Sequence, residues 1–372
     1  MLVPPKPLNP GFLQQIQGKS LLAEQGYLAG LDAAVPRLDP AGLLFAGMGG
    51  SGATAMLVRD AASRVLGTPF TLVQHYNLPN HVKPDWHVLA VSYSGQTEET
   101  LSTVRQAMRR GCRVTAFSTG GELAAMAGRN VPQPEGHQPR VALAHTWFSV
   151  LGFLEGSGLL GAERVPIKAA VAAIREVDAA CGPGVPEERN EARQLARRLQ
   201  GKIPQVYTTP AFAGLGVFFA SLMNENAKRI CDVDEIPEMN HNAFTGWSGD
   251  PLRTHFTALV LSHGAQNPEL ARRIEFMRGR YEAWGVPWHH RVFAPIQTFA
   301  DHVVEQARAL QLLDYTSYYA AELGGVDPAQ IDDVRALKAH LRQAPPASED
   351  PVRPLTGPLG KLAPEVDPQY LL

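Results

Sequence analysis

The order of apolar and polar positions from Gly42 onward predicts short buried strands that alternate with helices. Apolar, β-branched and aromatic residues gather in runs bounded by turn residues, at 43–46, 70–73, 86–92 and 113–117. Helical stretches lie between them at 53–66 and 98–110, and Gly111 after two arginines is a typical helix stop. Because strands that alternate with helices form βαβ units, the N-terminal half predicts a parallel sheet covered by helices.

The C-terminal half repeats this rhythm. A helix predicted over 168–180 stops at Cys181-Gly-Pro-Gly-Val-Pro, where glycine and proline break any helix. Beyond this joint, further elements are predicted at 191–199 (helix), 204–208 (strand), up to Arg229 (helix), 256–261 (strand) and 290–293 (strand). We therefore predict the fold class α/β, with two doubly wound parallel sheets.

The predicted domain boundaries follow from the same pattern. They are 1–160 for the N-terminal domain, 161–188 for a connecting helix and linker, 189–342 for a second domain of the same type and 343–372 for a Pro-rich tail. One short similarity suggests a duplication, because Leu89-Ala-Val-Ser-Tyr-Ser-Gly-Gln matches Leu259-Val-Leu-Ser-His-Gly-Ala-Gln. Each of these segments is a predicted strand that runs into a small polar turn.

Composition and charge exclude several classes of protein. Hydrophobic residues make up 45% and charged residues 19%, as in globular proteins, and no apolar stretch approaches the roughly 20 residues that cross a bilayer. The net charge of −2, without a dense Lys/Arg run, argues against nucleic-acid binding. Cys112, Cys181 and Cys231 are too few and too scattered for a disulfide framework or a thiolate zinc site. With no export signal at the N-terminus, we expect a cytoplasmic protein that binds small molecules, with no nucleic-acid or membrane partner.

A glycine-rich loop, Gly47-Met-Gly-Gly-Ser-Gly, follows a buried strand and opens a helix. Backbone N–H groups and the positive helix end then point at one spot, where a phosphate can bind. The spacing also fits the dinucleotide fingerprint, but the next strand, Phe70-Thr-Leu-Val-Gln-His-Tyr, lacks the acidic residue that holds the ribose. Tight turning and helix packing could explain some of the glycines, but not Ser51. We predict a phosphate cradle that includes Gly49, Gly50 and Ser51.

A second hydroxyl-rich loop, Ser92-Tyr-Ser-Gly-Gln-Thr, ends a later strand of the same sheet. Ligands of open α/β sheets bind at the carboxyl edge of the strands, so both loops are expected to serve one site. Ser92, Ser94 and Thr97 suit the oxygens of a terminal phosphate, to which hydroxyls donate charge-assisted hydrogen bonds. Thr97 is also the expected N-cap of the following helix, whether or not it binds the ligand.

Together, the two loops resemble the phosphate loops of the sugar isomerase (SIS) domain. Three further segments are similar to the bifunctional phosphoglucose/phosphomannose isomerase family of archaea and bacteria, namely Asn224-Glu-Asn-Ala-Lys, Glu238-Met-Asn-His-Asn and a C-terminal helix with Ala336-Leu-Lys. The resemblance spans nearly all of 42–342. It implies two SIS-type three-layer αβα subdomains with flavodoxin-like parallel sheets, and a carbohydrate-metabolism enzyme of glycolysis and gluconeogenesis. Such an enzyme interconverts glucose 6-phosphate, with mannose 6-phosphate as an expected second aldose, and fructose 6-phosphate through a cis-enediolate.

The resemblance also implies a catalytic set. The family's base falls on Glu225, its enediolate-stabilising arginine on Arg140, its ring-opening histidine on His241 and its C-terminal lysine on Lys338. Isomerisation needs these chemical types: a carboxylate base, a cation near the developing oxyanion and an acid/base group for ring opening. It does not require a cofactor or a metal. In related enzymes the histidine reaches the active site of the partner subunit. A homodimer with active sites at the subunit interface is therefore expected.

Other interpretations stay open from the residues alone. Glu225 could instead be a surface glutamate paired with Lys228 or Arg229 at helical spacing, and Glu238 is a rival base. The alternative function is a non-catalytic SIS-domain sensor of sugar phosphates, although the segment before Gly42 is too short for a convincing DNA-binding module. An NAD-dependent dehydrogenase is disfavoured by the missing acidic residue.

Overall fold

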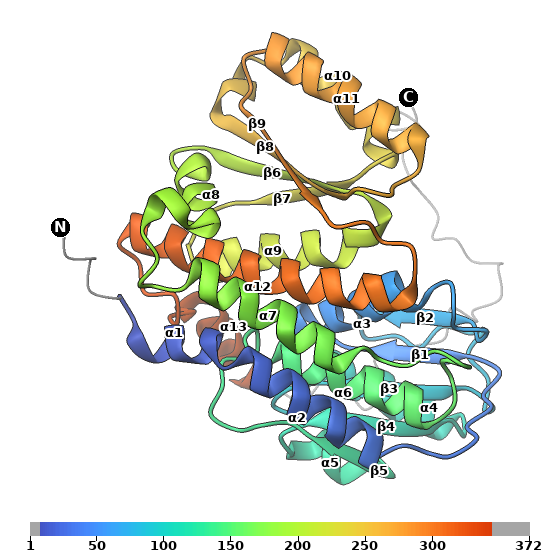
Figure 1. Cartoon of the computed structure of the whole chain (residues 1–372). Helices are drawn as coiled ribbons and strands as arrows, with labels where there is room; N and C mark the ends of the chain where they lie inside the picture. The colour runs from blue at the N-terminus through green and yellow to red at the C-terminus, as the bar shows by residue number, and fades with distance from the viewer. Residues whose placement is uncertain (1–7, 344–372) are drawn as a thin grey trace, which may run out of the picture. The chain divides into compact units, whose positions relative to one another are not determined.

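The computed structural model describes residues 8–343, which contain two parallel sheets flanked by helices (Figure 1). By its internal contacts the chain divides into two units, residues 1–330 and 331–372, and both sheets belong to the first. The described part of the second unit consists mainly of one helix, α13 (Asp332–Gln343). The predicted tail at 343–372 lies outside the described residues, apart from Gln343.

The first sheet has five parallel strands in the order β2-β1-β3-β4-β5. Its strands are β1 (Leu43–Ala46), β2 (Phe70–Val73), β3 (His87–Val91), β4 (Arg113–Ser118) and β5 (Arg129–Pro132). The helices that follow them are α3 (Gly49–Ala62), α4 (Glu98–Arg109), α5 (Gly121–Met126) and α6 (Leu143–Gly156). The strand order changes direction between β1 and β3, which makes the carboxyl ends of these two strands the topological switch point.

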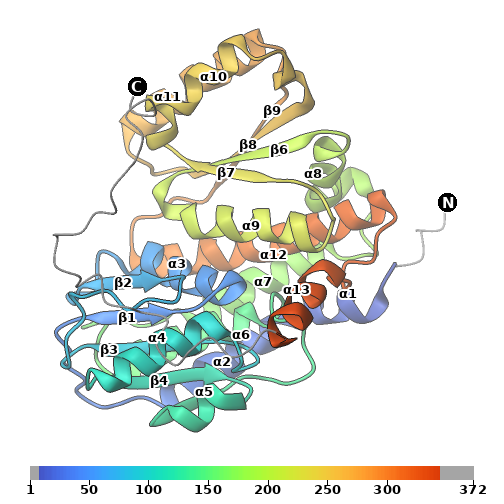
Figure 2. The same ribbon diagram turned by 180° about the vertical axis from the view of Figure 1, so that it is seen from behind.

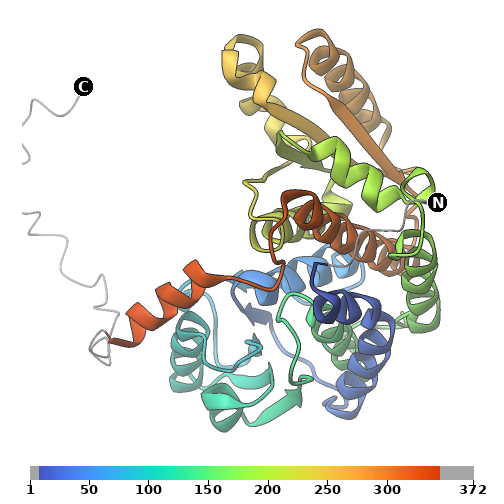
Figure 3. The ribbon, with the colours of Figure 1, turned by 90° about the vertical axis from the view of Figure 1, so that its left-hand side faces the viewer.

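Alternation along the strands sends apolar side chains to both faces of this sheet. Phe45 and Leu89 lie in the core that includes α3 and α6, whereas Leu44 and Val88 pack into a separate core with α4. The turned views show helices on both faces (Figures 2 and 3). A strand that is buried on both faces is typical of parallel sheets, and it explains the nearly continuous apolar runs in the sequence.

The second sheet repeats the topology of the first with four parallel strands in the order β7-β6-β8-β9. The strands are β6 (Ile203–Thr208), β7 (Asp232–Glu235), β8 (Phe256–His263) and β9 (Trp288–Phe293). The associated helices are α8 (Glu191–Leu199), α9 (Ala213–Glu225), α10 (Ala243–Gly249), α11 (Pro268–Ala283) and α12 (Phe299–Gly324). Val206 and Leu259 face α9 and α12, while Tyr207 and Val260 face α11. The α/β fold with two three-layer subdomains is therefore confirmed, and β3 and β8 hold equivalent places, as the short duplicated segment suggests.

The inner helices of the two sheets share one hydrophobic core, which includes residues from α3, α6, α9 and α12. Three further helices complete this layer, namely α1 (Pro10–Gln17), α2 (Lys19–Asp32) and α7 (Ile167–Cys181). α2 crosses α6 very closely, since a Cβ on Gly30 would lie 2.0 Å from the Ser149 carbonyl oxygen. The boundaries predicted at 160 and 188 stay predictions, because this shared core spans them.

Candidate active site

The glycine-rich loop leaves the carboxyl end of β1 and enters the first turn of α3. Gly49 has a φ of +52°, a left-handed conformation that favours glycine. Packing leaves little room for a side chain at Gly47 or Gly52, because a Cβ would lie 3.0 Å from the Val91 carbonyl oxygen in the first case and 2.9 Å from the Gly47 carbonyl oxygen in the second. Packing therefore accounts for part of the glycine pattern, as one of the alternatives predicts.

Gly50 and Ser51 are not explained by this packing. Gly50 lacks a positive φ, and the nearest atom to a Cβ placed there would be the Arg140 Cα, at 3.9 Å. The fold thus does not need a glycine at position 50, and the space that this residue leaves lies between the start of α3 and Arg140. The half-buried Ser51 lies in the same first helical turn, where free N–H groups and the positive helix end favour an anion.

The second loop brings its hydroxyl groups together at the neighbouring strand end. Ser92 Oγ and Thr97 Oγ1 lie 2.8 Å apart, and Ser94 is exposed. Thr97 occupies the N-cap position of α4, as predicted, but its side chain makes no capping bond and contacts Ser92 instead. Glu98 accepts a hydrogen bond from the Tyr76 hydroxyl, so at least this carboxylate is engaged away from the hydroxyl cluster.

Arg140 carries a buried charge that is held on several sides, with an exposed fraction of 3%. Its Nε donates to Asn226 Oδ1 at 2.6 Å, and its Nη1 donates to Gln138 Oε1 at 3.3 Å and to Glu225 Oε2 at 3.2 Å. Its Nη2 donates to the Pro328 carbonyl oxygen. Because a guanidinium stays protonated and its donors form a rigid fork, these bonds fix a positive charge next to the Glu225 carboxylate.

Glu225 is the last residue of α9, and its side chain is 34% exposed. Phe218 and Leu222, on the same helical face, are buried, which anchors the end of the helix. The carboxylate pairs with Arg140, while Lys228 Nζ donates to the Glu225 main-chain carbonyl at 2.7 Å. The carboxylate is thus held by a buried cation and still reaches solvent, a combination that suits a group exchanging protons with a small ligand.

A polar support behind Arg140 was missed by the sequence reasoning. Asn226 Nδ2 donates to Ser317 Oγ at 2.9 Å, and Ser317 Oγ donates to the Asp314 carbonyl oxygen at 2.9 Å, both on α12. The Phe12 ring centroid lies 5.2 Å from the Arg140 Cζ, within cation–π range. The available signal was the presence of polar residues such as Asp314 and Ser317 at fully buried positions of an apolar helix.

A buried ion pair extends this support. Lys19 on α2 donates to the carboxylate of Asp314 on α12, and both side chains have an exposed fraction of 0%. Burial lowers the pKa of Lys19 and raises that of Asp314, and the attraction between the two charges opposes both shifts. The Arg140 charge also acts on Asp314 in the direction that favours its ionised form.

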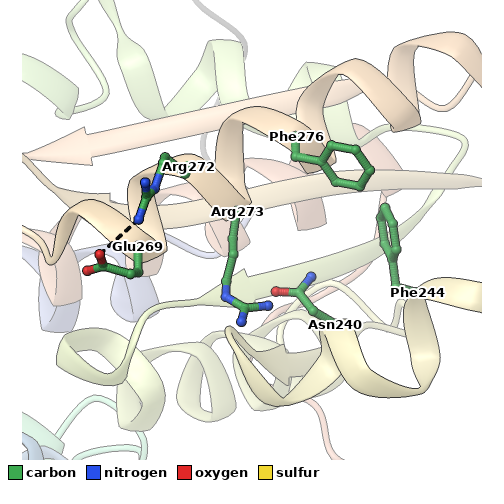
Figure 4. A pocket seen from close by; sticks show the side chains of 6 residues that line it. All are labelled: Asn240, Phe244, Glu269, Arg272, Arg273 and Phe276. Atoms are coloured by element: carbon green, nitrogen blue, oxygen red, sulfur yellow. Dashed lines mark hydrogen bonds and ion pairs between the residues drawn. The ribbon is translucent and has the colours of Figure 1, made fainter.

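His241 and Glu238 lie on a short 3₁₀ helix, η3 (Glu238–His241), and both side chains are exposed. Within residues 8–343 neither side chain forms a hydrogen bond or ion pair, so the structure does not join them to the Arg140–Glu225 pair. A pocket of about 390 Å³ adjoins this segment, with Arg273 directed toward Asn240 (Figure 4). It is lined by Asn240, Phe244, Glu269, Arg272, Arg273 and Phe276.

Lys338 lies on α13, in the second unit, and its side chain is exposed. Its assignment to the catalytic set stays a prediction. In the described part of the chain, no group of three or more His, Cys, Asp or Glu side chains could hold a metal ion. None of the helices in that part combines the length and apolar character needed to span a bilayer.

Known proteins resemble this chain along most of its length. Residues 188–341 match the family described as the bacterial phospho-glucose isomerase C-terminal SIS domain. The chain is 30% identical over 310 residues to the bifunctional phosphoglucose/phosphomannose isomerase of Aquifex aeolicus, covering 81% of this chain and 91% of that protein. The protein of the same name from Caldicellulosiruptor bescii is 28% identical, covering 81% and 89%.

Solved structures show the same fold. The tagatose-6-phosphate ketose/aldose isomerase of Escherichia coli superposes with a TM-score of 0.66 at 12% identity, covering 88% of this chain and 97% of that chain. Such low identity supports the fold alone, whereas the Aquifex protein combines substantial identity with almost full coverage. The chain therefore belongs to the bifunctional phosphoglucose/phosphomannose isomerase family and is an isomerase.

Proposed function

We propose that this chain interconverts fructose 6-phosphate with glucose 6-phosphate and with mannose 6-phosphate, through a cis-enediolate intermediate. The observation that carries the proposal is the 3.2 Å ion pair between Arg140 and Glu225, in which the arginine has its main chain next to Gly50 of the glycine-rich loop. It puts a cation and a carboxylate within reach of a ligand whose phosphate lies at the start of α3. The relatives from Aquifex and Caldicellulosiruptor carry both activities in their names.

In this proposal the phosphate anchors the substrate. The first turn of α3 at Gly49, Gly50 and Ser51 supplies N–H groups and the positive helix end. The hydroxyls of Ser92, Ser94 and Thr97 donate the remaining hydrogen bonds. A phosphate fixed at one end of the sugar leaves C1 and C2 to be positioned by the rest of the site, which converts the proton transfer into an intramolecular step.

Glu225 then acts as the base. Its carboxylate removes the proton from C2 of the aldose, the C–H electron pair forms the C1–C2 double bond, and the C1 carbonyl oxygen takes the negative charge. Arg140 stabilises this oxyanion. The C2 hydroxyl proton moves to the C1 oxygen, and Glu225 returns its proton to C1 while the C2–oxygen double bond forms, which gives the ketose. In the reverse direction, protonation of the planar enediolate on one face of C2 gives glucose 6-phosphate and on the other face mannose 6-phosphate.

Ring opening requires a further acid/base group, and we assign it to His241, because an imidazole can both donate and accept a proton. His241 is exposed and belongs to a segment remote in sequence from Arg140, so we propose that it acts in the partner subunit's site within a homodimer. Lys338 is proposed as an additional polar group of the catalytic set. A cytoplasmic location fits substrates whose phosphate charge keeps them from crossing membranes.

The test is a coupled assay with fructose 6-phosphate that follows glucose 6-phosphate and mannose 6-phosphate separately. The Glu225→Gln variant keeps the shape of the side chain and removes its basicity, so its kcat should fall by about 10²-fold to 10⁴-fold. Glu238→Gln is the matched control, because it makes the same chemical change on a nearby exposed carboxylate. Thermal melts of both variants establish that they are equally folded.

The outcomes separate the remaining alternatives. Formation of both aldoses, lost in Glu225→Gln and kept in Glu238→Gln, supports a dual-specificity isomerase with Glu225 as its base. The opposite pattern would move the base to Glu238. If calorimetry shows that fructose 6-phosphate binds but the assay shows no turnover, the result would favour the non-catalytic sensor over the enzyme.

A further inference from the structure

A second pocket, of about 710 Å³, lies at the carboxyl edge of the second sheet. All four strands of that sheet send their C-terminal ends toward it, through Glu235 at the end of β7, Thr209 after β6, His263 at the end of β8 and Ile296 after β9. Because the strand order reverses between β6 and β8, this is the topological switch point of the second sheet, where open α/β sheets bind ligands.

This pocket is the structural counterpart of the phosphate cradle, but its chemistry differs. The segment from His263 to Gln266 holds the place of the second phosphate loop, since β8 is equivalent to β3. The loop after β6 reads Thr209-Pro-Ala-Phe and carries no glycine run. The second sheet therefore keeps a pocket at its switch point without the features that specialise the first sheet for phosphate.

Two polar groups in the lining lack partners. Thr209 is 1% exposed, yet its hydroxyl forms no hydrogen bond with any other residue in the described part of the chain. The Gln266 side-chain oxygen is also buried and forms no hydrogen bond with the described residues. Buried polar groups in native proteins are nearly always hydrogen-bonded, so these two residues of the pocket wall retain hydrogen-bonding capacity that the described part of the fold does not use.

The remaining polar lining includes imidazole, amide and carboxylate side chains, which together supply hydrogen-bond donors and acceptors. Burial, followed by the charge of Arg64, lowers the pKa of His263, and burial lowers that of His302, so both imidazoles are neutral near pH 7. Asp60 is paired with Arg59, and carboxylates of both Glu163 and Glu235 also line the pocket. Apolar area is supplied by Leu270, Ile296 and Phe299.

From this lining we propose that the pocket binds a small polyhydroxylated compound, a sugar or polyol, either free or carrying one acidic group, at a site separate from the active site. Neutral imidazoles, amides and carboxylates match the paired donors and acceptors of vicinal hydroxyls, and Phe299 offers a face for the C–H side of the ligand. Arg64, which forms no ion pair among residues 8–343, is the group that would meet an acidic substituent.

Two helices connect this site with the proposed active site. α3 begins at the cradle with Gly49 and ends beside the pocket with Arg59 to Ala61, while α9 begins near the pocket and ends at Glu225. The two helices lie side by side, and the Gly214 N–H of α9 donates to Asp60 Oδ2 of α3 at 2.7 Å (Figure 1). Occupancy of the pocket is therefore expected to change the kinetics of isomerisation, an expectation that rests on the proposed function.

The experiment is calorimetric titration of the full chain with glucitol and with glucitol 6-phosphate, which lack a carbonyl group and cannot be isomerised. Thr209→Val removes the unpartnered hydroxyl at nearly constant shape and should weaken binding at this site about fivefold, as expected for one neutral hydrogen bond. Thr208→Val is the matched control, because Thr208 is equally buried and its hydroxyl is also unpartnered within the described residues, but it does not line the pocket. Glucitol 6-phosphate is also titrated with the Ser92→Ala variant, in which binding at the phosphate cradle is weakened. The comparison distinguishes binding at the cradle from binding at the second pocket.

Weaker binding in Thr209→Val but not in Thr208→Val supports the proposal. Arg64→Ala then shows which form of the ligand the pocket binds. If the variant loses affinity for glucitol 6-phosphate alone, the ligand is phosphorylated. If the affinities of the variant and the wild type are equal for both compounds, the ligand is the free polyol. Equal effects of the two threonine variants, or no saturable binding beyond the cradle, would overturn it. Since the readout is binding, a failure of the proposed isomerase activity leaves this test intact, and with active enzyme a change in KM for fructose 6-phosphate on adding glucitol reports the coupling.

Discussion

Replacing Lys19 by methionine should destabilise the fold strongly, because it leaves the carboxylate of Asp314 in the core without its partner. Both side chains have an exposed fraction of 0%, so water cannot replace the lost ion pair. Methionine has nearly the shape of the lysine stem, which restricts the change to the ammonium group. Asp178, whose charge also acts on the ammonium, loses the same favourable interaction.

The size of the effect follows from burial. Removing one partner of a fully buried ion pair costs about 3 to 5 kcal/mol of unfolding free energy, whereas replacing both partners is often close to neutral. Asp314→Asn alone is expected to cost a comparable amount, limited by deprotonation of Lys19, whose pKa burial already lowers. The double variant should therefore cost less than the sum of the single variants by at least about 2 kcal/mol.

The assay is equilibrium unfolding in urea, followed by tryptophan fluorescence and far-UV circular dichroism on the wild type, both single variants and the double variant. Arg278→Met serves as the control, since Arg278 belongs to an exposed pair with Glu275 and its loss should leave the urea midpoint essentially unchanged. A Lys19→Met variant with the stability of the wild type, or strictly additive costs in the double variant, would refute the reasoning.

Three further predictions concern other parts of the structure. Burial, and then the charge of His137, lowers the pKa of His145 to about 4. Below pH 6.5 the unfolded chain therefore binds a proton that the folded chain does not, so this group should cost about 2 kcal/mol of stability by pH 5. His145→Gln should flatten the dependence of the urea midpoint on pH between 7 and 5, and an unchanged slope would contradict the assignment. Gly30→Ala should destabilise by about 1 to 3 kcal/mol or prevent folding, because its Cβ would collide with the backbone of α6. Gly279→Ala, on α11 with no atom within 4 Å of the added Cβ, should instead stabilise by about 0.5 to 1 kcal/mol, and thermal melts that failed to separate the two would count against the close crossing. Arg140→Lys keeps the charge but not the fork of donors, so kcat/KM for fructose 6-phosphate should fall at least about 100-fold, and activity within threefold of the wild type would exclude the proposed role.

Much of the fold could be predicted because its strands are buried on both faces and therefore leave clear apolar runs in the sequence. The predicted strand at 43–46 coincides with β1, and the helix at 191–199 coincides with α8. The strands that were missed, β5 and β7, lie at sheet edges and are short and largely polar or charged, as in Asp-Val-Asp-Glu of β7. An edge strand packs on fewer neighbours and so needs less apolar surface, which removes the pattern on which the prediction depends.

The candidate site also has a part that could be predicted from the sequence and a part that could not. The cradle loops are local, so their glycines and hydroxyls could be identified from a few adjacent residues. The pairing of Arg140 with Glu225 joins positions 85 residues apart, and that of Lys19 with Asp314 joins positions 295 apart. No periodicity links such residues, since their proximity depends on how α2, α9 and α12 pack in the shared core. Only the resemblance to a known family predicted Arg140 and Glu225, and neither Asn226 nor Ser317 was identified from the sequence.

The two sheets have equivalent topology, and each has a switch point at the carboxyl ends of its strands, so topology cannot decide which of the two performs catalysis. The two switch points differ in the side chains that other parts of the fold contribute to them. At the first switch point, Arg140 comes from the segment before α6 and Glu225 from the end of α9, a helix of the second sheet, and both are fixed against α12 through Asn226 and Ser317. The second switch point receives instead Arg59 to Ala61 from α3 and His302 from α12. α3 and α9 thus each link the two positions, so the proposed coupling between ligands at the two positions would pass through these helices.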